Sequence, residues 1–204
     1  EKGMKALPNA TNPAKPIDAT YINPKQKAFE KKTLLTKGQY NITDDSELKL
    51  SYTANRSDNV LYPAGSMDAD YDDSNIYTVG YTTRNLGKFS KELDFDYYYS
   101  NVDHPMSTKL RNSGATYNTA RYKTSANGEK IKNVMEVADS LITIGLDTSV
   151  RNWRGEMYRT DRATGGITNL NPPLASTDTT NKAIFSKVEK SFGKLDLEVG
   201  ARYD

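Results

Sequence analysis

The sequence of 204 residues contains no cysteine and a single histidine, His104. The lack of cysteine excludes disulfide bonds, zinc–cysteine sites and thiol nucleophiles. A serine–histidine–acid triad would have to use His104, and no Gly-x-Ser-x-Gly motif accompanies that histidine. The sequence therefore offers neither thiol-based nor serine–histidine–acid catalysis.

Long hydrophobic runs are also missing. Hydrophobic residues, tyrosine included, make up 36% of the chain, and the mean hydropathy is −0.76, which is low for a conventional globular core. No segment approaches the roughly 18 apolar residues of a membrane helix, and the N-terminal segment has no signal-peptide core. A transmembrane β-barrel is compatible with this composition, because its strands need only about 9–11 residues with alternate positions facing lipid.

The sequence has no excess of charge of one sign. The 28 basic and 26 acidic side chains leave a net charge of +2 and alternate along the chain. No basic stripe is available for phosphates, so we expect no nucleic-acid partner.

What the sequence does have is a strict alternation of apolar and polar residues from Leu34 onward. Because side chains in a strand alternate between two faces, this pattern predicts strands with one apolar and one polar face. The clearest apolar sets are Leu48, Leu50, Tyr52 and Ala54; Leu93, Phe95, Tyr97 and Tyr99; Ile142, Ile144, Leu146 and Val150; and Leu195, Leu197, Val199, Ala201 and Tyr203.

The spacing of these sets predicts eight strands in residues 33–204 and a loop or extended arm in residues 1–32. The predicted strands are residues 33–42, 47–57, 74–85, 90–102, 118–137, 140–153, 182–190 and 194–204.

The predicted connections alternate in length. Short turns at 43–46, 85–88, 138–139 and 191–194 separate long polar loops at 58–73, 103–117 and 154–181. Outer-membrane β-barrels are connected in this way, with short periplasmic turns and long extracellular loops, and tyrosines lie within or at the ends of the apolar sets as in an interfacial girdle. A soluble β-sandwich also uses two-sided strands and stays open as an alternative. Because the sequence begins in a predicted loop and ends within a predicted strand, we expect a segment of a larger barrel.

Three stretches resemble the TonB-dependent outer-membrane receptors. LDLEVGARYD (195–204) resembles the strand of these receptors that ends in Gly-x-Arg-Tyr-Asp. LYPAGSMDADYDDSNIYTVGY (61–81) and KELDFDYYYSNVDHPMSTKLRN (91–112) are similar to strands and loops of their copper-type branch, in which Asp-His-x-Met follows a tyrosine-rich strand. The likeness covers most of residues 47–204, whereas residues 1–32 match only loosely.

The resemblance implies a barrel of about 22 strands whose lumen holds an N-terminal plug, located in the outer membrane of a Gram-negative bacterium. Such receptors bind a scarce metal or metal complex and admit it when the TonB system acts on the plug. They are transporters and not enzymes, so the resemblance implies that this protein is not an enzyme. The sequence contains no recognisable plug domain and no TonB box. It also lacks the plug cysteine and methionine that complete the copper site in that branch.

His104 and Met106 are the candidate metal ligands, and Met67 in the preceding predicted loop is a third. Imidazole and thioether donors suit copper better than hard cations. An i, i+2 pair in an extended chain points both side chains the same way, and Pro105 stiffens the segment between them. The competing interpretation is a solvated loop histidine beside packed methionines.

Four functions remain open at this point. The first is a copper-uptake receptor, with outer-membrane lipid and the TonB system as partners and copper as the transported ligand. The others are a receptor of the same fold for a ferric siderophore, haem or nickel; a stand-alone structural or adhesive outer-membrane barrel; and a soluble binding sandwich.

Overall fold

The computed structural model describes residues 21–23, 25–172, 174 and 176–204, and its regular elements are all β-strands. No helix in this part of the chain is long and apolar enough to cross a membrane. The predicted all-β antiparallel fold class is confirmed. The strands are β1 (Glu30–Asn41), β2 (Ser46–Val60), β3 (Asp68–Arg84), β4 (Ser90–Ser107), β5 (Thr116–Val137), β6 (Ser140–Asp161), β7 (Ile167–Leu170), β8 (Thr177–Phe192) and β9 (Leu195–Tyr203).

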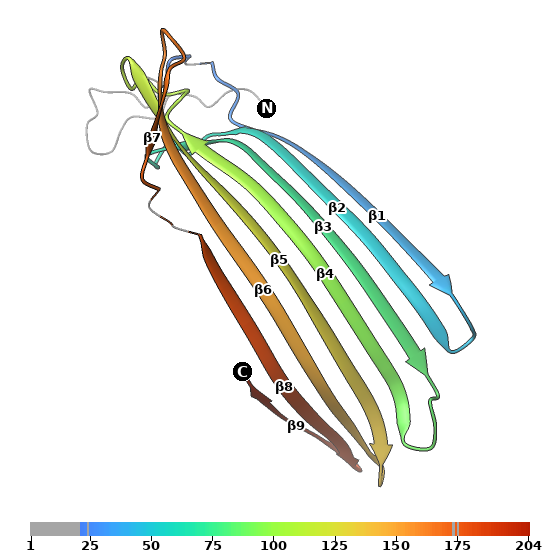
Figure 1. Cartoon of the computed structure of the whole chain (residues 1–204). Coiled ribbons are helices and arrows are strands. Elements are labelled where there is room, and N and C mark those ends of the chain that lie inside the picture. Colours follow the sequence, from blue (N-terminus) through green and yellow to red (C-terminus); the bar gives the residue numbers. More distant parts are fainter. Residues whose placement is uncertain (1–20, 24, 173, 175) are drawn as a thin grey trace.

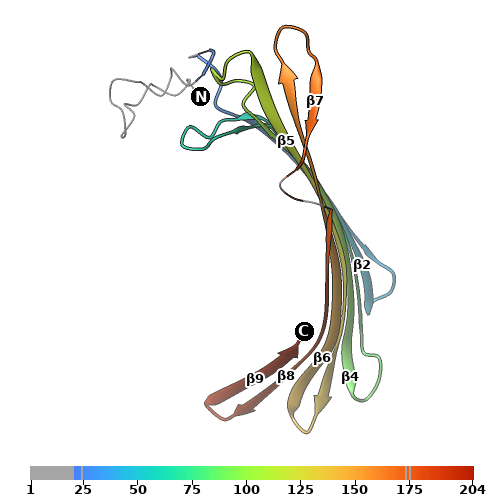
Figure 2. The ribbon, with the colours of Figure 1, turned by 60° about the vertical axis from the view of Figure 1, so that its left-hand side comes forward.

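The strands form one sheet in which neighbours in sequence are neighbours in space (Figure 1). The order is β1-β2-β3-β4-β5-β6-β8-β9, every pair is antiparallel, and only the short β7 lies off this path, paired with β6. Figure 2 shows that the long sheet is curved. We call the end with the connections 61–67, 108–115 and 162–166 the distal end, and the end with the turns 42–45, 85–89 and 138–139 the proximal end.

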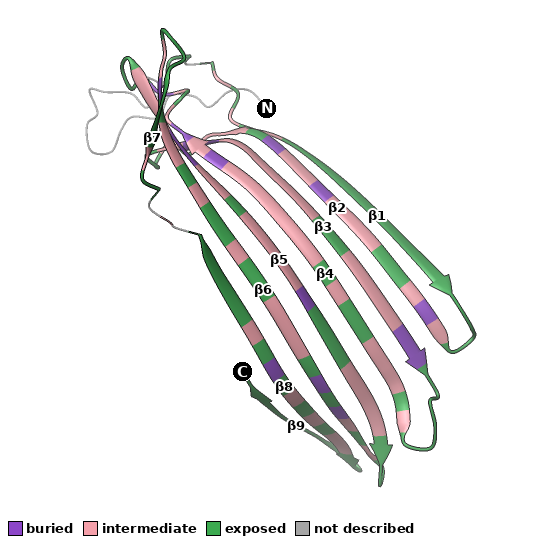
Figure 3. Cartoon of the chain, viewed as in Figure 1, coloured by how far each residue is buried: buried purple, intermediate pink, exposed green. Residues whose placement is uncertain are grey.

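The pairing register aligns the alternating sequences into continuous rows. Directly paired residues project from the same side of a sheet, so each row stays on one face. Leu146 in one such row is 53% exposed, and Figure 3 shows exposed and less exposed positions alternating along the strands. We call the side of the sheet that carries the row of Leu146 the apolar face, and the opposite side the polar face. The row contains Leu48, Tyr81, Phe95, Ile131, Leu146, Ile184 and Tyr203.

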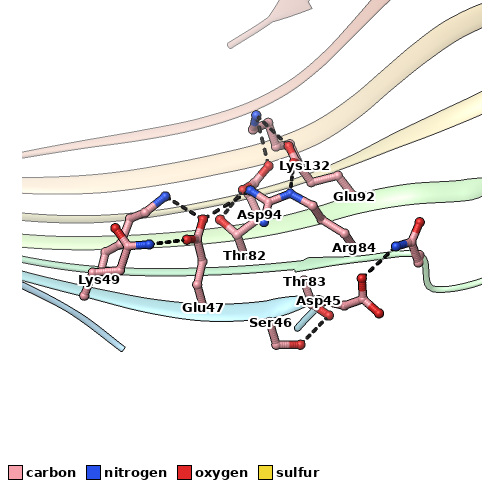
Figure 4. A network of polar contacts seen from close by, with 12 residues as sticks. Asp45, Ser46, Glu47, Lys49, Thr82, Thr83, Arg84, Glu92, Asp94 and Lys132 are labelled. Carbon is pink, nitrogen blue, oxygen red and sulfur yellow. Dashed lines mark hydrogen bonds and ion pairs between the residues drawn. The ribbon is translucent and has the colours of Figure 1, made fainter. Parts of the chain in front are cut away.

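Compensating charges connect four strands on the polar face near the proximal end (Figure 4). Glu47 contacts Lys49 at 2.7 Å and Arg84 at 3.1 Å. Arg84 also contacts Glu92 at 3.1 Å, and Lys132 of β5 lies 4.0 Å from Glu92. Opposite charges thus occupy neighbouring positions across the strands, which stabilises a polar sheet face.

Aromatic rings on the polar face lie against glycines of the neighbouring strand. A Cβ atom on Gly145 would come within 2.2 Å of Phe185 Cζ, so the ring needs the space that the missing side chain leaves. Glycines inside strands accompany sheet bending, and rings packed over them restore cross-strand contact. These pairs therefore suit the curvature seen in Figure 2. They are Tyr98 with Gly128, Tyr122 with Gly155, and Phe185 with Gly145.

The strands extend further at the distal end than the sequence predicts. Eight of the nine strands correspond to the predicted ones, and the short β7 is additional. The predicted long loops at 58–73, 103–117 and 154–181 are shorter than expected, because strand structure covers much of all three ranges. Pairing continues there through polar side chains. Arg121 donates to Asp103 Oδ1 at 2.8 Å, and Arg159 donates to Asn118 Oδ1 at 3.2 Å, where residues 103 and 159 fall in predicted loops. Such pairs show no apolar alternation, so hydrophobic periodicity does not detect them.

The segment before β1 is anchored on the distal end. The Tyr21 hydroxyl donates to Asp68 Oδ1 at 3.0 Å, and Arg111 donates two hydrogen bonds of 2.8 Å to the same carboxylate. The side chain of Asp68 is only 2% exposed. Residues 30–32 belong to β1, so the non-strand segment is shorter than the predicted 1–32, of which residues 1–20 and 24 lie outside the described residues.

Candidate metal site

A ladder of tyrosines ends the apolar band on the apolar face. The rings of Tyr52 and Tyr77 stack with centroids 4.8 Å apart, and Tyr99 continues the ladder at 6.2 Å. The Tyr52 hydroxyl donates to Asn75 Oδ1 at 2.9 Å, and Asn75 and Asn101 form the next row towards the distal end. Tyrosine is suited to a boundary between apolar and wet surroundings, because its ring is apolar and its hydroxyl is polar. The strands thus continue beyond the apolar band.

Strand β4 carries His104 and Met106 beyond this boundary, within the strand and not in a loop. Both residues occupy the polar face, because they are two positions apart in extended backbone. His104 is paired with Tyr122 of β5, and Met106 is paired with Ala120. Both side chains are partly exposed. An imidazole and a thioether therefore project side by side from the distal part of the polar face.

The register adds Met157 of β6 to the same row. Ala120 is paired with Met106 on one side and with Met157 on the other, so the two methionines flank a small residue. Two strand spacings separate their backbones by about 9.6 Å, and methionine side chains are long and adaptable. Hydrophobic periodicity does not identify Met157, because residue 157 falls in the predicted loop 154–181. Met157 could be found only by knowing that it lies in a strand and that this strand pairs it with Ala120.

Met67 lies in the connection 61–67, just before β3. Ala69, two residues later, is paired with Met106, and the register of β3 against β4 shifts between Ala69 and Asp73. Met67 therefore belongs to the same distal region, but it has no position in the row of Met106 and Met157. The structure brings His104 and Met106 onto one strand face and leaves Met67 at its edge.

A carboxylate lies near the imidazole. Asp72 Oδ1 is 3.6 Å from His104 Nδ1, which is beyond hydrogen-bond distance but within electrostatic reach. No group of three or more histidine, cysteine, aspartate or glutamate side chains in the described ranges could hold a metal ion. The candidate donors at this place are thus one imidazole, one nearby carboxylate and two thioethers.

The carboxylate of Asp103, next to His104 in sequence, is occupied by other groups. Arg121 donates hydrogen bonds to it from both Nε and Nη2, and the Tyr71 hydroxyl donates to it at 3.3 Å. The hydrogen bonds from Arg121 hold the pKa of Asp103 below its usual range, while burial raises the pKa of Tyr71. Asp103 stands on the apolar face, opposite to His104, and does not belong to the candidate site.

Comparison with known proteins gives a structural match. No protein-family model and no curated protein sequence matches the chain. A solved structure of "Copper transporter OprC" is similar to this chain with a TM-score of 0.72 and 15% sequence identity. The alignment covers 85% of this chain and 28% of that one, so the chain spans less than a third of the length of the transporter it matches. The likeness shows that the two share the fold of this β-sheet.

Proposed function

We propose that the chain is part of a TonB-dependent outer-membrane receptor that takes up a metal ion or metal complex, with copper as the cargo. In this assignment the sheet is a barrel segment in the outer membrane of a Gram-negative bacterium. The apolar face contacts lipid, the polar face lines the lumen, and the distal end faces the outside. The matching sheet of a copper transporter and the sequence resemblance to the copper-type receptors support the proposal.

The observation that carries the choice of cargo is the shared polar face of His104, Met106 and Met157. Thioether sulfur is a soft ligand that selects Cu(I), and imidazole also binds copper well. A hard cation such as Mg²⁺ or Ca²⁺ would call for a cage of oxygen ligands instead. On the lumen side of a barrel, these donors would meet cargo entering from outside.

The distal site would hold only part of the coordination shell. Three protein donors, two on β4 and one on β6, can approach one ion from one side, and further ligands would come from another part of the receptor or from the cargo's own chelator. Met67 remains a proposed additional donor, because it lies at the edge of the same region.

Copper binding to the intact receptor tests the proposal. Replacing His104, Met106 and Met157 with alanine, singly and together, should lower copper affinity by at least about 10-fold per ligand. Affinity should also fall on acidification, because protonated imidazole cannot ligate a metal. Met135→Ala is the matched control, since Met135 is a methionine near the proximal end, paired with Ile142 on the apolar face.

The same measurement separates the other cargoes. Nickel, haem and a panel of ferric siderophores should bind more weakly than copper and should respond less to the three alanines. If the triple variant binds and imports copper as the parent does, the copper assignment is wrong. Tight binding of a siderophore or haem by parent and variant alike would favour the alternative receptor. A parent that binds none of these ligands would favour a structural or adhesive barrel.

A further inference from the structure

Two unpaired cations face each other across strands β5 and β6. Lys123 and Arg154 are direct cross-strand partners on the apolar face, distal to the tyrosine ladder, and both are exposed. Neither forms an ion pair with any residue that the structure describes. Like charges directly opposite each other destabilise a sheet, so this pair has a cost to the fold that a bound anion would remove.

Two carboxylates neighbour this pair, and both are engaged by other groups. Lys123 acts electrostatically on Asp103, its cross-strand partner on β4, but forms no ion pair with it. Asp103 is engaged by Arg121 through two hydrogen bonds, and Asp178 accepts a hydrogen bond from Asn152. Arg154 uses its Nε to donate to Asn152 Oδ1 at 3.0 Å, and no hydrogen bond from its two terminal nitrogens to a described residue is recorded. The ammonium group of Lys123 and the two terminal nitrogens of Arg154 are thus available to bind one anion.

Lys123 and Arg154 line an open groove of about 660 Å³ together with Asp103, Asp178 and uncharged hydrogen-bonding side chains. Asn101, Ser125 and Asn152 form one cross-strand row beside the two cations. Amide and hydroxyl groups both donate and accept hydrogen bonds, as sugar hydroxyls do. The groove therefore combines charged donors suited to phosphate with neutral groups suited to sugar.

An apolar groove lies on the same face, on the proximal side of the tyrosine ladder. It has a volume of about 610 Å³ and is lined by Phe95, Ile131, Leu146 and Ile184 among others. Asn127, in the ladder's row beside Tyr99, separates the two grooves along β5. An amphiphile lying along the strands would place its acyl chain in the apolar groove and its headgroup in the polar one.

We propose that the groove at Lys123 and Arg154 binds the phosphorylated sugar headgroup of a glycolipid in the outer leaflet of the membrane. This inference rests on the proposed function, because it takes the apolar face to be lipid-facing and the distal end to be outside. The two cations contact the phosphate, the row of Asn101, Ser125 and Asn152 contacts the sugar, and the tyrosine ladder lies at the depth where acyl chain and headgroup meet.

Native mass spectrometry of the intact receptor in detergent, titrated with bisphosphorylated lipid A, tests the proposal. Lys123→Gln with Arg154→Gln should weaken binding at least about 10-fold, because the charge-assisted bonds to phosphate are lost. Lipid A without its phosphates should bind the parent as weakly. Lys31→Gln with Lys37→Gln is the matched control, since it removes two exposed lysines from the polar face of β1 and should leave lipid binding unchanged.

Two results would overturn the inference: equal binding of lipid A by parent and Lys123/Arg154 variant, or its displacement from the parent by millimolar inorganic phosphate, which would indicate a free-anion site. Heat-modifiable gel mobility and outer-membrane fractionation of each variant show that it is folded and correctly located. A receptor that is folded in the outer membrane and fails the lipid test disproves the headgroup site alone. Failure of fractionation itself would disprove the proposed function.

Discussion

The ring of Tyr98 on β4 lies over Gly128, its direct cross-strand partner on β5. A Cβ atom on Gly128 would approach Tyr98 Cε1 to 2.5 Å and the carbonyl oxygen of Thr148 to 2.9 Å. The glycine thus accommodates an aromatic ring and a neighbouring backbone at once. The polar face can hold a large side chain there only because one partner has none.

Gly128→Ala should therefore destabilise the folded protein by about 1–3 kcal/mol, the usual cost of overpacking. Gly38→Ala on β1 is the matched control, because nothing lies within 4 Å of a Cβ atom there, and its effect should be within about 1 kcal/mol of zero. Urea unfolding of both variants in the same micelles measures the difference. Equal stability would mean that the ring of Tyr98 moves freely and that Gly128 has no packing role.

The proximal half of the sheet could be predicted because one apolar and one polar face leave a period of two in the sequence. Ile142, Ile144, Leu146 and Val150 alternate with small or polar residues, and they do lie in β6. The same strand continues to Asp161 through Arg154, where the alternation is lost. Pairing there depends on what β5 presents opposite each residue, and hydrophobicity does not encode that.

The residues of the candidate metal site likewise divide into those that the sequence could predict and those that it could not. His104 and Met106 could be selected from the sequence because the residue types are rare and their spacing in extended chain puts them on one side. Met157 could not, because its place beside Ala120 follows from the register of three strands. The pairing of Lys123 with Arg154 is likewise a fact of register, with 30 residues between the two positions in the sequence.

The hydrogen bonds that Asp68 accepts from Tyr21 and Arg111 lead us to expect unequal effects of two substitutions. Arg111→Met should cost about 3–5 kcal/mol, because it leaves the buried carboxylate of Asp68 without its cation. Tyr21→Phe should cost only about 1 kcal/mol, because Asp68 still accepts from Arg111 and from the backbone N–H of Tyr62 at 2.7 Å. Tryptic cleavage at Lys25 and Lys27 measures release of the segment, with faster cleavage expected for Arg111→Met. Identical cleavage of both variants would place the anchor elsewhere.

Alkaline titration provides an independent test of the environment of the Tyr21 hydroxyl. Burial, with the nearby Asp68 carboxylate, raises the pKa of Tyr21 from its ordinary value of 10.0 to about 12. Because the folded state keeps this proton longer than the unfolded state, the stabilisation is complete below the ordinary value and is lost as the pH rises towards 12. Tyrosinate absorbance of the parent should contain one late component that is missing in Tyr21→Phe. Superimposable late titrations would exclude a buried Tyr21 hydroxyl.

Charge placed on the apolar face should impair insertion according to depth. Leu146 lies between Ile131 and Ile184 in the middle of the apolar band, so Leu146→Arg should cost about 2–4 kcal/mol. Leu197 is paired with Lys190, a position that is already charged, so Leu197→Arg should cost about 0–1 kcal/mol. Glu198→Arg, on the polar face, is the control and should insert like the parent. Heat-modifiable gel mobility of the membrane-inserted receptor gives the folded fraction, and equal tolerance of all three changes would contradict the assignment of lipid and lumen faces.

Cysteine labelling should place the two ends of the sheet on opposite sides of the membrane. Ser66, Asn112 and Ala163 are exposed residues in the three distal connections, whereas Ser107 is 1% exposed within β4 and is unsuitable as a labelling site. These 204 residues contain no native cysteine, so each single cysteine is the only thiol among them. On whole cells the three distal cysteines should react with a membrane-impermeant maleimide.

Cysteines at Asp44 and Lys88, which are exposed in the proximal turns, should react only after the outer membrane is permeabilised. The physical reason is strand parity, because antiparallel neighbours place alternate connections on opposite sides. Met106 and Met157 lie near the distal connections, so the side that labels on whole cells is also the side from which cargo would reach them. Labelling of the proximal cysteines on intact cells, in a protein shown to be folded, would reverse the orientation and would place the candidate metal site at the periplasmic mouth.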